Sequence, residues 1–403
     1  MKTRVRSHRR RNVLLFLAIL AAYSAWCLLR PLPDLKPQVA NSVISVKAPA
    51  STLVWPNSQA AVSIVGSDII ETKNGNKPVP TASTAKVITA LMVLKQKPLS
   101  LNQQGPMITL TDKDVAIYKD YVSRDGSVVP VLAGEQISQY QALQTVMLPS
   151  ANNMADSLAI WAYGSLPAYA AAANSYLKAQ GLTGTHIGAD ASGLAADSVS
   201  TAADLAKIGA LAMQNPVLAQ IAGQSTATGI PVAGTIKNVN DLIGINNIIG
   251  LKTGNSNEAG GAFISASTTK QNNKTIVITT AVVNAPSLFQ SMKDSIPLLK
   301  SAQTNFTQNS IVKVNQTLGT YNLPWGGSVT AKAANAMSVF EWNGQTTKAN
   351  IILDNIPVNS SSGNSAGRVA LNKTPIYDTK SMPIILASTP TQPPIKWRLT
   401  HPF

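Results

Sequence analysis

The sequence predicts an α+β domain built around an antiparallel sheet, followed by a small all-β domain. The first part rests on a strand-like start, a long helical middle and strand-like runs before a last helix, an order typical of α+β proteins. Apolar residues recur with helical spacing at 83–96, 135–148, 152–163, 168–180, 201–213 and near 286–301. Strand-like runs lie at 60–66, 68–73, 245–252, 260–268 and 274–283.

The second part rests on a change of character at about residue 306. Six short segments of alternating apolar and polar residues follow, separated by Gly, Asn and Pro. They are SIVKVNQ, SVTAKA, MSVFEW, KANIILDNI, GRVALN and MPIILAST. Such a series is typical of a small sandwich or barrel. We therefore expect one domain at 52–305 and a β-rich domain at 306–403.

The chain of 403 residues carries a formal net charge of +15, from 33 basic and 18 acidic residues. Six basic residues precede the first apolar run: Lys2, Arg4, Arg6, Arg9, Arg10 and Arg11. No cluster of basic residues with interleaved aromatics follows them, so the sequence does not indicate a nucleic-acid-binding protein. The remaining positive excess fits a weak attraction to anionic wall polymers or lipid headgroups.

The chain has one cysteine, Cys27, and three isolated histidines, His8, His186 and His401. A single cysteine excludes a disulfide within the chain, and no histidine pair has the HExxH spacing of a zinc peptidase. We therefore expect neither a metal centre nor a bound cofactor.

The N-terminus predicts the compartment. Residues 13–29 are 17 nearly unbroken apolar positions, at the short end of what spans a bilayer as a helix. The basic tail, 1–12, should stay cytoplasmic, which places the rest of the chain outside the cell membrane. A cleavable signal peptide is the alternative to an anchor at 13–30, although no clean small-x-small cleavage site follows. The proline-rich stretch 31–51 is expected to be a linker.

Three short motifs occur in order along the chain. Ser83-Thr-Ala-Lys86 opens a predicted helix, Ser150-Ala-Asn152 joins two helices, and Lys252-Thr253-Gly254 ends a predicted strand. The first pattern alone is common, since S-x-x-K occurs four times and S-x-N three times, whereas K-T-G occurs once. Only the set that begins at Ser83 combines this order with a long apolar helix behind the serine.

The first motif suits nucleophilic catalysis. A serine hydroxyl is a poor nucleophile unless a base takes its proton, and Lys86 lies one helical turn from Ser83. A lysine can act as a base only when burial or a nearby cation lowers its pKa, and Lys252 could be that cation.

The other motif residues suit supporting roles. The backbone N–H of Ser83 at a helix start and that of Asn255 could together bind an oxyanion. Ser150 could pass a proton to the leaving amine, while Asn152 could orient the substrate amide.

At these motifs, residues 52–305 resemble the serine-type D-Ala-D-Ala carboxypeptidases, the low-molecular-mass penicillin-binding proteins. Asp190-Ala-Ser-Gly-Leu194 and Ser200-Thr-Ala-Ala-Asp-Leu-Ala206 also look like segments of that family. The resemblance implies a serine β-lactamase/DD-peptidase-like fold and an acyl-enzyme on Ser83 that releases the terminal D-Ala of peptidoglycan stem peptides. It further implies that Lys252, Thr253 and Gly254 bind the substrate, and that β-lactam antibiotics inhibit covalently.

Two features depart from the family. The C-terminus lacks an amphipathic anchor helix, so the N-terminal helix would replace it, and the stretch 289–293 has no arginine to assist carboxylate binding. A β-lactamase of the same fold is one alternative, although 151–251 contain no glutamate to bind a deacylating water. A non-catalytic wall-binding scaffold is another. Endopeptidase and transpeptidase outcomes use the same acyl-enzyme.

Overall fold

The computed structural model describes residues 2–271, 273–372, 376 and 378–402, with the backbone alone at 2–8. Met1, at the start of the expected tail, and residues 373–375, 377 and 403 of the expected C-terminal domain lie outside the described residues. The chain forms two compact units. One spans Ala50–Phe306, and the other combines the segment up to Pro49 with the segment from Thr307 onward.

The larger unit is built on a five-stranded antiparallel sheet. Its strands, in spatial order, are β11 (Ile248–Ser256), β12 (Gly260–Gln271), β13 (Lys274–Ala285), β3 (Gln59–Ile64) and β4 (Ile70–Lys73). The strands expected from the sequence all belong to this sheet, and β11 forms one of its edges. An edge strand has one free side, so β11 can present its backbone to neighbouring elements.

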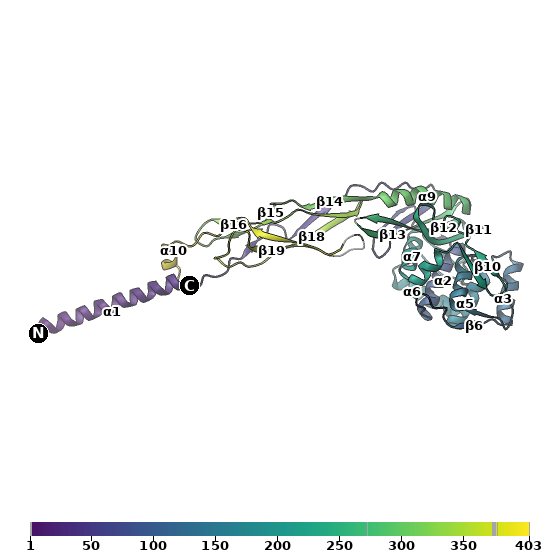
Figure 1. The fold of residues 1–403 in the computed structure, drawn as a ribbon, viewed down its shortest axis with the longest axis horizontal. Coiled ribbons are helices and arrows are strands. Elements are labelled where there is room, and N and C mark those ends of the chain that lie inside the picture. The colour runs from purple at the N-terminus through teal and green to yellow at the C-terminus, as the bar shows by residue number, and fades with distance from the viewer. Residues whose placement is uncertain (1, 272, 373–375, 377, 403) are drawn as a thin grey trace. The chain divides into compact units, whose positions relative to one another are not determined.

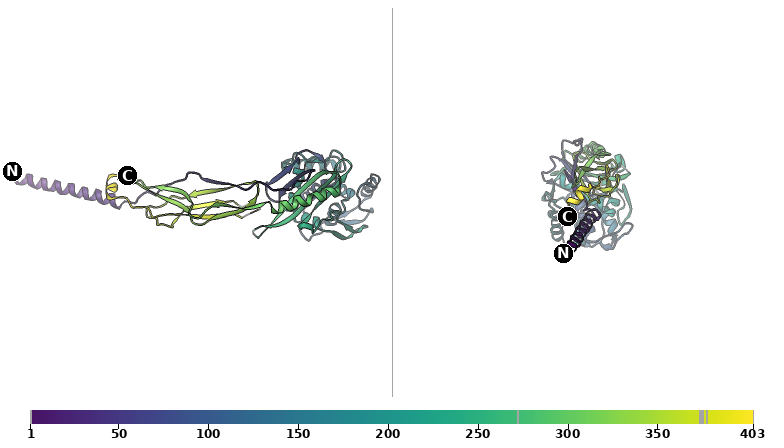
Figure 2. Two further views of the ribbon diagram at one scale, coloured as in Figure 1. Left: turned by 90° about the horizontal axis from the view of Figure 1, so that it is seen from above. Right: turned by 90° about the vertical axis from the view of Figure 1, so that its left-hand side faces the viewer.

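Helices cover both faces of this sheet. On one face, α7 (Ala202–Gln214) lies so close that a Cβ on Gly209 would approach Ile264 of β12 to 2.8 Å. On the other face, Thr269 and Gln271 of β12 donate side-chain hydrogen bonds to the carbonyl of Gln303 in α9 (Leu288–Thr304). Positions 264 and 269 differ by an odd number and therefore point to opposite faces. Figure 1 labels both helices, and α9 is the green helix that runs along the sheet in Figure 2.

The helical part of the unit packs around α2 (Ala85–Gln96), which contacts α4, α5, α6 and α7. The further helices are α3 (Asp112–Ser123), α4 (Gln139–Met147), α5 (Asn152–Tyr163), α6 (Leu166–Ala179) and α8 (Pro216–Ala222). Nine of the twelve residues of α2 are buried, so this helix is apolar on nearly every side and forms the centre of the core.

Short strand pairs and turns complete this unit. They are β5 (Val79–Pro80) with β8 (Val199–Ser200), β6 (Met107–Thr109) with β7 (Gln136–Ser138), and β9 (Thr226–Ile230) with β10 (Gly234–Lys237). The 3-10 turns are η1 (Ala82–Thr84) and η2 (Ile245–Asn247). The helix expected at 135–148 therefore begins only after β7, because Ser138 caps α4 by accepting a hydrogen bond from the Gln141 N–H.

The second unit contains a seven-stranded sheet with the order β1-β15-β16-β20-β19-β18-β2 and a separate pair of strands, β14 with β17. The C-terminal strands are β14 (Phe306–Val312), β15 (Thr317–Asn322), β16 (Ser328–Ala333), β17 (Met337–Trp342), β18 (Thr346–Leu353), β19 (Ser365–Leu371) and β20 (Lys380–Leu386). Every segment expected from the sequence therefore contributes to a strand. The buried Tyr321 donates to the carbonyls of Asp354 (2.7 Å) and Ala366 (3.1 Å) in this unit.

The expectation of a linker at 31–51 is wrong for much of that stretch. β1 (Pro37–Gln38) pairs with β15, and β2 (Val43–Lys47) pairs with β18, so the two strands form the two edges of the sheet. Leu35 is 3% exposed in the core of the same unit. The prolines suggested a linker, but proline is tolerated on edge strands, where its missing N–H need not pair.

At the N-terminus, α1 (Lys2–Leu29) includes a 21-residue stretch, Arg9–Leu29, that is long and apolar enough to cross a membrane. No second helix in the described ranges meets both conditions. Most of its large apolar side chains are exposed, as expected of an anchor or a signal segment and not of a core helix. A short C-terminal helix, α10 (Ile395–Thr400), lies beside its end, where the Tyr23 hydroxyl donates to the Leu399 carbonyl.

The pairing of the N-terminal segment with the C-terminal strands predicts the effect of Leu35→Ala. We expect this change to destabilise the second unit by about 2–4 kcal/mol, because it removes a buried side chain from the core. The matched change Val43→Ala, on the half-exposed face of β2, should cost less than about 1 kcal/mol. Hydrogen exchange of peptides from β18 and β19 measures both. Equal, negligible effects would restore the linker interpretation.

Candidate active site

The serine and lysine of the first motif lie at the junction of η1 and α2. Ser83 belongs to η1, and Lys86 lies in the first turn of α2, where its Nζ is 2.8 Å from the Ser83 Oγ. The i to i+3 spacing brings the two side chains to one helical face, as the sequence predicted. Lys86 is fully buried, so its amine meets the serine hydroxyl away from bulk water.

Two further oxygens contact the Lys86 amine. Nζ lies 2.6 Å from the Asn152 Oδ1 and 3.0 Å from the Ser192 carbonyl oxygen. Both oxygens can only accept hydrogen bonds, so each of them takes one N–H. A neutral amine has two N–H groups and one lone pair. With both N–H groups engaged, the lone pair is left for the third neighbour, the hydroxyl of Ser83.

Burial lowers the pKa of Lys86 to about 7, against the opposing charges of Asp190 and Asp156. At neutral pH a substantial fraction of this amine is therefore unprotonated and can accept a proton. A surface lysine, with a pKa near 10.4, would be almost entirely charged under the same conditions. The first motif thus combines the geometry and the protonation state that a general base needs.

A second lysine, Lys252 of β11, is also buried, and its Nζ donates to the Thr253 carbonyl at 3.0 Å. Burial, and next the charge of Lys86, lower the pKa of Lys252 well below its usual value. From the sequence, the charge on Lys252 was expected to lower the pKa of Lys86. In the structure the cause that lowers the pKa of Lys86 is burial, and it is the charge of Lys86 that lowers the pKa of Lys252.

The strand that carries Lys252 lies directly against η1, which contains Ser83. A Cβ on Gly254 would lie 3.3 Å from the Ser83 N and 3.1–3.2 Å from atoms of Thr84, so a larger residue would push β11 away from η1. Thr253 is buried and Asn255 is exposed at this end of the strand. The third motif therefore lies next to the first, as the roles expected for Lys252 and Asn255 require. Gly254 makes the close approach possible.

The second motif begins at a residue with unusual backbone geometry. Ser150 has φ +66°, in the left-handed region that non-glycine residues seldom adopt. Its hydroxyl is buried and has no hydrogen-bond partner among the described residues. Two residues on, the Asn152 N–H donates to the Ser127 carbonyl at 2.7 Å, which fixes the start of α5 and the direction of the Asn152 side chain toward Lys86.

The carbonyl of Ser192 belongs to a tight turn at residues 190–195. The carboxylate of Asp190 accepts backbone N–H groups at 2.6–3.2 Å from Ser192, Gly193, Leu194 and Ala195. Gly193 has φ +79°, and a Cβ there would lie 2.1 Å from the Ala82 carbonyl of η1. The turn can therefore lie against η1 only with glycine at this position.

The sequence predicted no role for this turn beyond its likeness to the family. Its signal was the pair Asp190 and Gly193, which is typical of a carboxylate-capped turn with one left-handed residue. The contact to Lys86 is made by the backbone of Ser192, and a backbone oxygen has no sequence signature. Asn152 contacts Lys86 through its side-chain Oδ1, and this contact depends on how α5 packs against α2, which no local pattern indicates.

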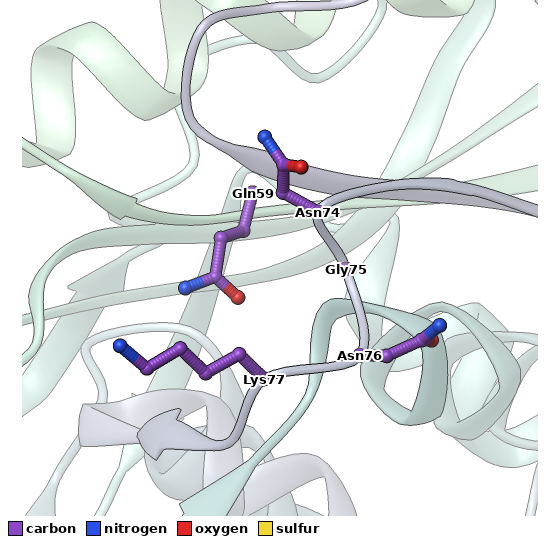
Figure 3. A pocket seen from close by; sticks show the side chains of 5 residues that line it. All are labelled: Gln59, Asn74, Gly75, Asn76 and Lys77. Atoms are coloured by element: carbon purple, nitrogen blue, oxygen red, sulfur yellow. The ribbon is translucent and has the colours of Figure 1, made fainter.

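A separate hollow in this unit lies at the β4 end of the sheet, where Gln59, Asn74, Gly75, Asn76 and Lys77 line it. Figure 3 shows the side chains of Gln59 and Lys77 extending to the same side of the hollow, while Asn74 points away. When the side-chain amide of Gln59 is oriented with its nitrogen toward these carbonyls, Gln59 donates hydrogen bonds to the carbonyls of Asn74 (3.1 Å) and Lys77 (3.0 Å). The hollow is thus the inside of a turn held by Gln59, and the motif residues do not line it.

Comparisons with known proteins agree with this geometry. A family model described as D-alanyl-D-alanine carboxypeptidase matches residues 48–287, more than half of the chain. A D-alanyl-D-alanine endopeptidase of Pseudomonas aeruginosa is 30% identical over 254 residues, covering 60% of this chain and 77% of that protein. A D-alanyl-D-alanine carboxypeptidase of Streptomyces sp. strain K15 is 31% identical over 224 residues, covering 51% and 73%.

Among solved structures, penicillin binding protein 5 from Haemophilus influenzae is similar, with a TM-score of 0.57. The alignment covers 85% of this chain and 99% of that chain at 21% identity. This likeness shows the fold, and it confirms the predicted α+β arrangement of an antiparallel sheet with helices followed by a β-rich region.

The close approach of the 190–195 turn to η1 predicts a difference between two glycine substitutions. Gly193→Ala should destabilise the larger unit by at least about 2 kcal/mol more than Gly181→Ala. Both residues have positive φ, but a Cβ at Gly181 meets open space and should cost only about 1–2 kcal/mol. Denaturant unfolding measures the two values. Equal costs would mean that the turn can move away from η1 freely.

Proposed function

Because this chain belongs to the family of D-alanyl-D-alanine carboxypeptidases, we propose that it removes the terminal D-Ala from peptidoglycan stem peptides through an acyl-enzyme on Ser83. The observation that carries the proposal is the Lys86 amine, which is buried, has a pKa of about 7 and lies 2.8 Å from the Ser83 Oγ. Asn152 and Ser192 hold its two N–H groups, so its lone pair is directed at the hydroxyl that must lose a proton.

In the acylation step, the Ser83 Oγ attacks the carbonyl carbon of the penultimate D-Ala while its proton passes to the Lys86 amine. The backbone N–H groups of Ser83 and Asn255 would stabilise the resulting oxyanion. The bond from that carbon to the leaving nitrogen then breaks, and the nitrogen needs a proton. The buried hydroxyl of Ser150 would relay that proton from Lys86 to the departing D-Ala.

In the second step, water releases the shortened peptide. Lys86, neutral again once the D-Ala amine has taken the proton, accepts a proton from the attacking water. The ester between the peptide carbonyl and the Ser83 Oγ breaks, and the serine recovers its hydrogen. One base therefore serves both half-reactions, and neither of them calls for a cofactor.

The third motif would bind the terminal carboxylate of the substrate. Burial disfavours the protonated form of Lys252, whereas the carboxylate of a bound substrate would favour that form. Substrate binding should therefore be coupled to protonation of this lysine. A protonated Lys252 then helps to keep Lys86 neutral. Thr253 and Gly254 would position the same carboxylate beside the nucleophile. A β-lactam carries an equivalent carboxylate and carbonyl, and it would acylate Ser83 as a covalent inhibitor.

We also propose that residues 13–29 anchor the chain in the cell membrane with 52–305, as the catalytic domain, outside. Two observations support this arrangement: the apolar stretch of α1 is long enough to span, and its large side chains are exposed in the structure. Exposed apolar side chains such as Leu14, Phe16 and Ile19 are stable in lipid and costly in water. The basic residues before the stretch would stay on the cytoplasmic side.

The similarity to an endopeptidase favours one second candidate, cleavage of a D-Ala bond between cross-linked peptides. Both reactions use the same acyl-enzyme and differ in the leaving group on the attacked carbonyl. Mass spectrometry of two substrates distinguishes them: a free pentapeptide that loses one D-Ala indicates the carboxypeptidase, and a cross-linked dimer that splits indicates the endopeptidase.

Covalent labelling tests the nucleophile. A fluorescent penicillin should attach to the full-length protein, and peptide mapping should locate the label on Ser83. After cell fractionation, the labelled protein should be found in the membrane fraction. Ser83→Ala should take no label, because the hydroxyl beside the neutral Lys86 is gone. The control is Ser175→Ala, in a second S-x-x-K sequence on the exposed side of α6, which should label like the wild type. Unlabelled wild-type protein would leave only the scaffold alternative.

The lowered pKa of Lys86 predicts how labelling depends on pH. An amine acts as a base only when unprotonated, so the acylation rate should rise with pH, with a midpoint near 7, and level off above it. Lys86→Ala should lose roughly a thousandfold or more in this rate and should lose the dependence as well. Stopped-flow acylation from pH 5 to 9 measures both. A rate that is flat across this range in the wild type would exclude Lys86 as the base.

A further inference from the structure

Asp156 is a buried carboxylate on α5 that belongs to none of the three motifs. It is 5% exposed and lies six residues after Ser150, on the helix that begins with Asn152. Its Oδ2 accepts a hydrogen bond from the Tyr121 hydroxyl of α3 at 2.8 Å, and its Oδ1 accepts one from the Ala191 N–H at 2.8 Å. A buried carboxylate needs such partners, and this one has two.

The second of these contacts leads to the active site. Ala191 directly precedes Ser192, whose carbonyl accepts a hydrogen bond from the Lys86 amine at 3.0 Å. Asp190 closes the 190–195 turn on itself, whereas Asp156 ties that turn to α5. The same helix supplies Asn152, the other acceptor for Lys86, so α5 contributes to the positions of both acceptors. The turn is also held from α2, where the Thr89 hydroxyl donates to the Ala191 carbonyl at 2.6 Å.

We propose that Asp156 is a positioning residue for the reaction: by holding the Ala191 N–H, it keeps the Ser192 carbonyl where it takes one N–H of Lys86 and leaves the lone pair to Ser83. This inference rests on the proposed role of Lys86 as the base. Without Asp156, the turn would keep its internal hydrogen bonds to Asp190 and the hydrogen bond from Thr89 to the Ala191 carbonyl, but it would lose its attachment to α5. The amine would then rotate among its acceptors, and fewer encounters with substrate would find its lone pair directed at Ser83.

A carboxylate at this position also acts through its charge. Burial raises the pKa of Asp156 to about 6, and its ionised form favours the protonated form of Lys86. The other titratable groups around it are Lys86 on α2, Tyr121, Asp120 and Arg124 on α3, Tyr169 on α6, and Asp190 in the turn. Asp120 and Arg124 form an exposed ion pair with each other, so they contribute little to the field at Lys86.

The two effects can be separated by substitution. Asp156→Asn keeps an oxygen for the Ala191 N–H and a polar group for Tyr121 but removes the charge. Asp156→Ala removes both. The control Asp120→Asn removes a carboxylate from the neighbouring helix and touches neither Ala191 nor the Tyr121 hydroxyl.

Acylation by fluorescent penicillin, followed from pH 5 to 9, is the measurement, with circular dichroism to confirm folding. In Asp156→Ala the acylation rate at pH 8 should fall roughly 10- to 100-fold, the loss of one hydrogen bond to a charged group. With a pentapeptide substrate, kcat should fall far more than KM changes. In Asp156→Asn the rate at pH 8 should stay within about fivefold of the wild type. Its acidic limb should move to lower pH, because the carboxylate that favours the charged form of Lys86 is gone.

Three results would overturn the inference while leaving the proposed function intact. The first is that the wild type is acylated normally and a folded Asp156→Ala protein is acylated at the same rate. The second is an Asp156→Asn protein that is slowed at pH 8 as much as Asp156→Ala, because the oxygen that Asn keeps for the Ala191 N–H should preserve the rate. The third is an Asp156→Ala rate that falls only in proportion to the fraction unfolded, since a purely structural role predicts that result. A wild type that is not acylated at all would instead refute the proposed function.

Discussion

The whole site depends on a lysine that is kept out of water. Lys86 lies on α2, the helix at the centre of the core, where a charged ammonium would cost several kcal/mol to bury without compensation. The protein resolves this conflict by lowering the pKa of the amine and surrounding it with acceptors. The packing that stabilises the unit therefore also lowers the pKa of the amine that we propose as the base. Changes that let water reach α2 would affect chemistry and stability together.

Three parts of the chain that are far apart in sequence meet at this amine. They are η1 with Ser83, the start of α5, and the 190–195 turn. Each arrives with backbone geometry that an ordinary residue adopts with difficulty: Ala82 has φ +43°, Ser150 has φ +66° and Gly193 has φ +79°. At Ala82 and Ser150, which are not glycines, this conformation costs free energy and persists only where the surroundings hold it. Their concentration around Lys86 indicates that the stability of the core offsets the strain of a pre-organised site.

The motif residues could be placed from the sequence because their chemistry is carried by side chains at fixed spacing. Ser83 and Lys86 share a helical face by periodicity alone, and the order of helices and strands predicted the α+β class. The residues that the sequence left without a role act through the backbone or through burial. Ser192 contributes a carbonyl, and Asp156 is an ordinary helix residue until α3 and the turn bury it. The strands at 37–38 and 43–47 were missed because their partners lie about 300 residues away, beyond the reach of any local pattern.

The distance between those paired strands also bears on how the protein folds. β2 is made early, but its partner β18 begins at Thr346, and the whole Ala50–Phe306 unit lies between them. Contacts that close so long a loop form late, because their entropic cost must be met before they stabilise anything. Folding therefore starts with the enclosed unit, and the seven-stranded sheet is completed last. Until then Val43–Lys47 is an unpaired strand, with backbone groups free to pair with other chains.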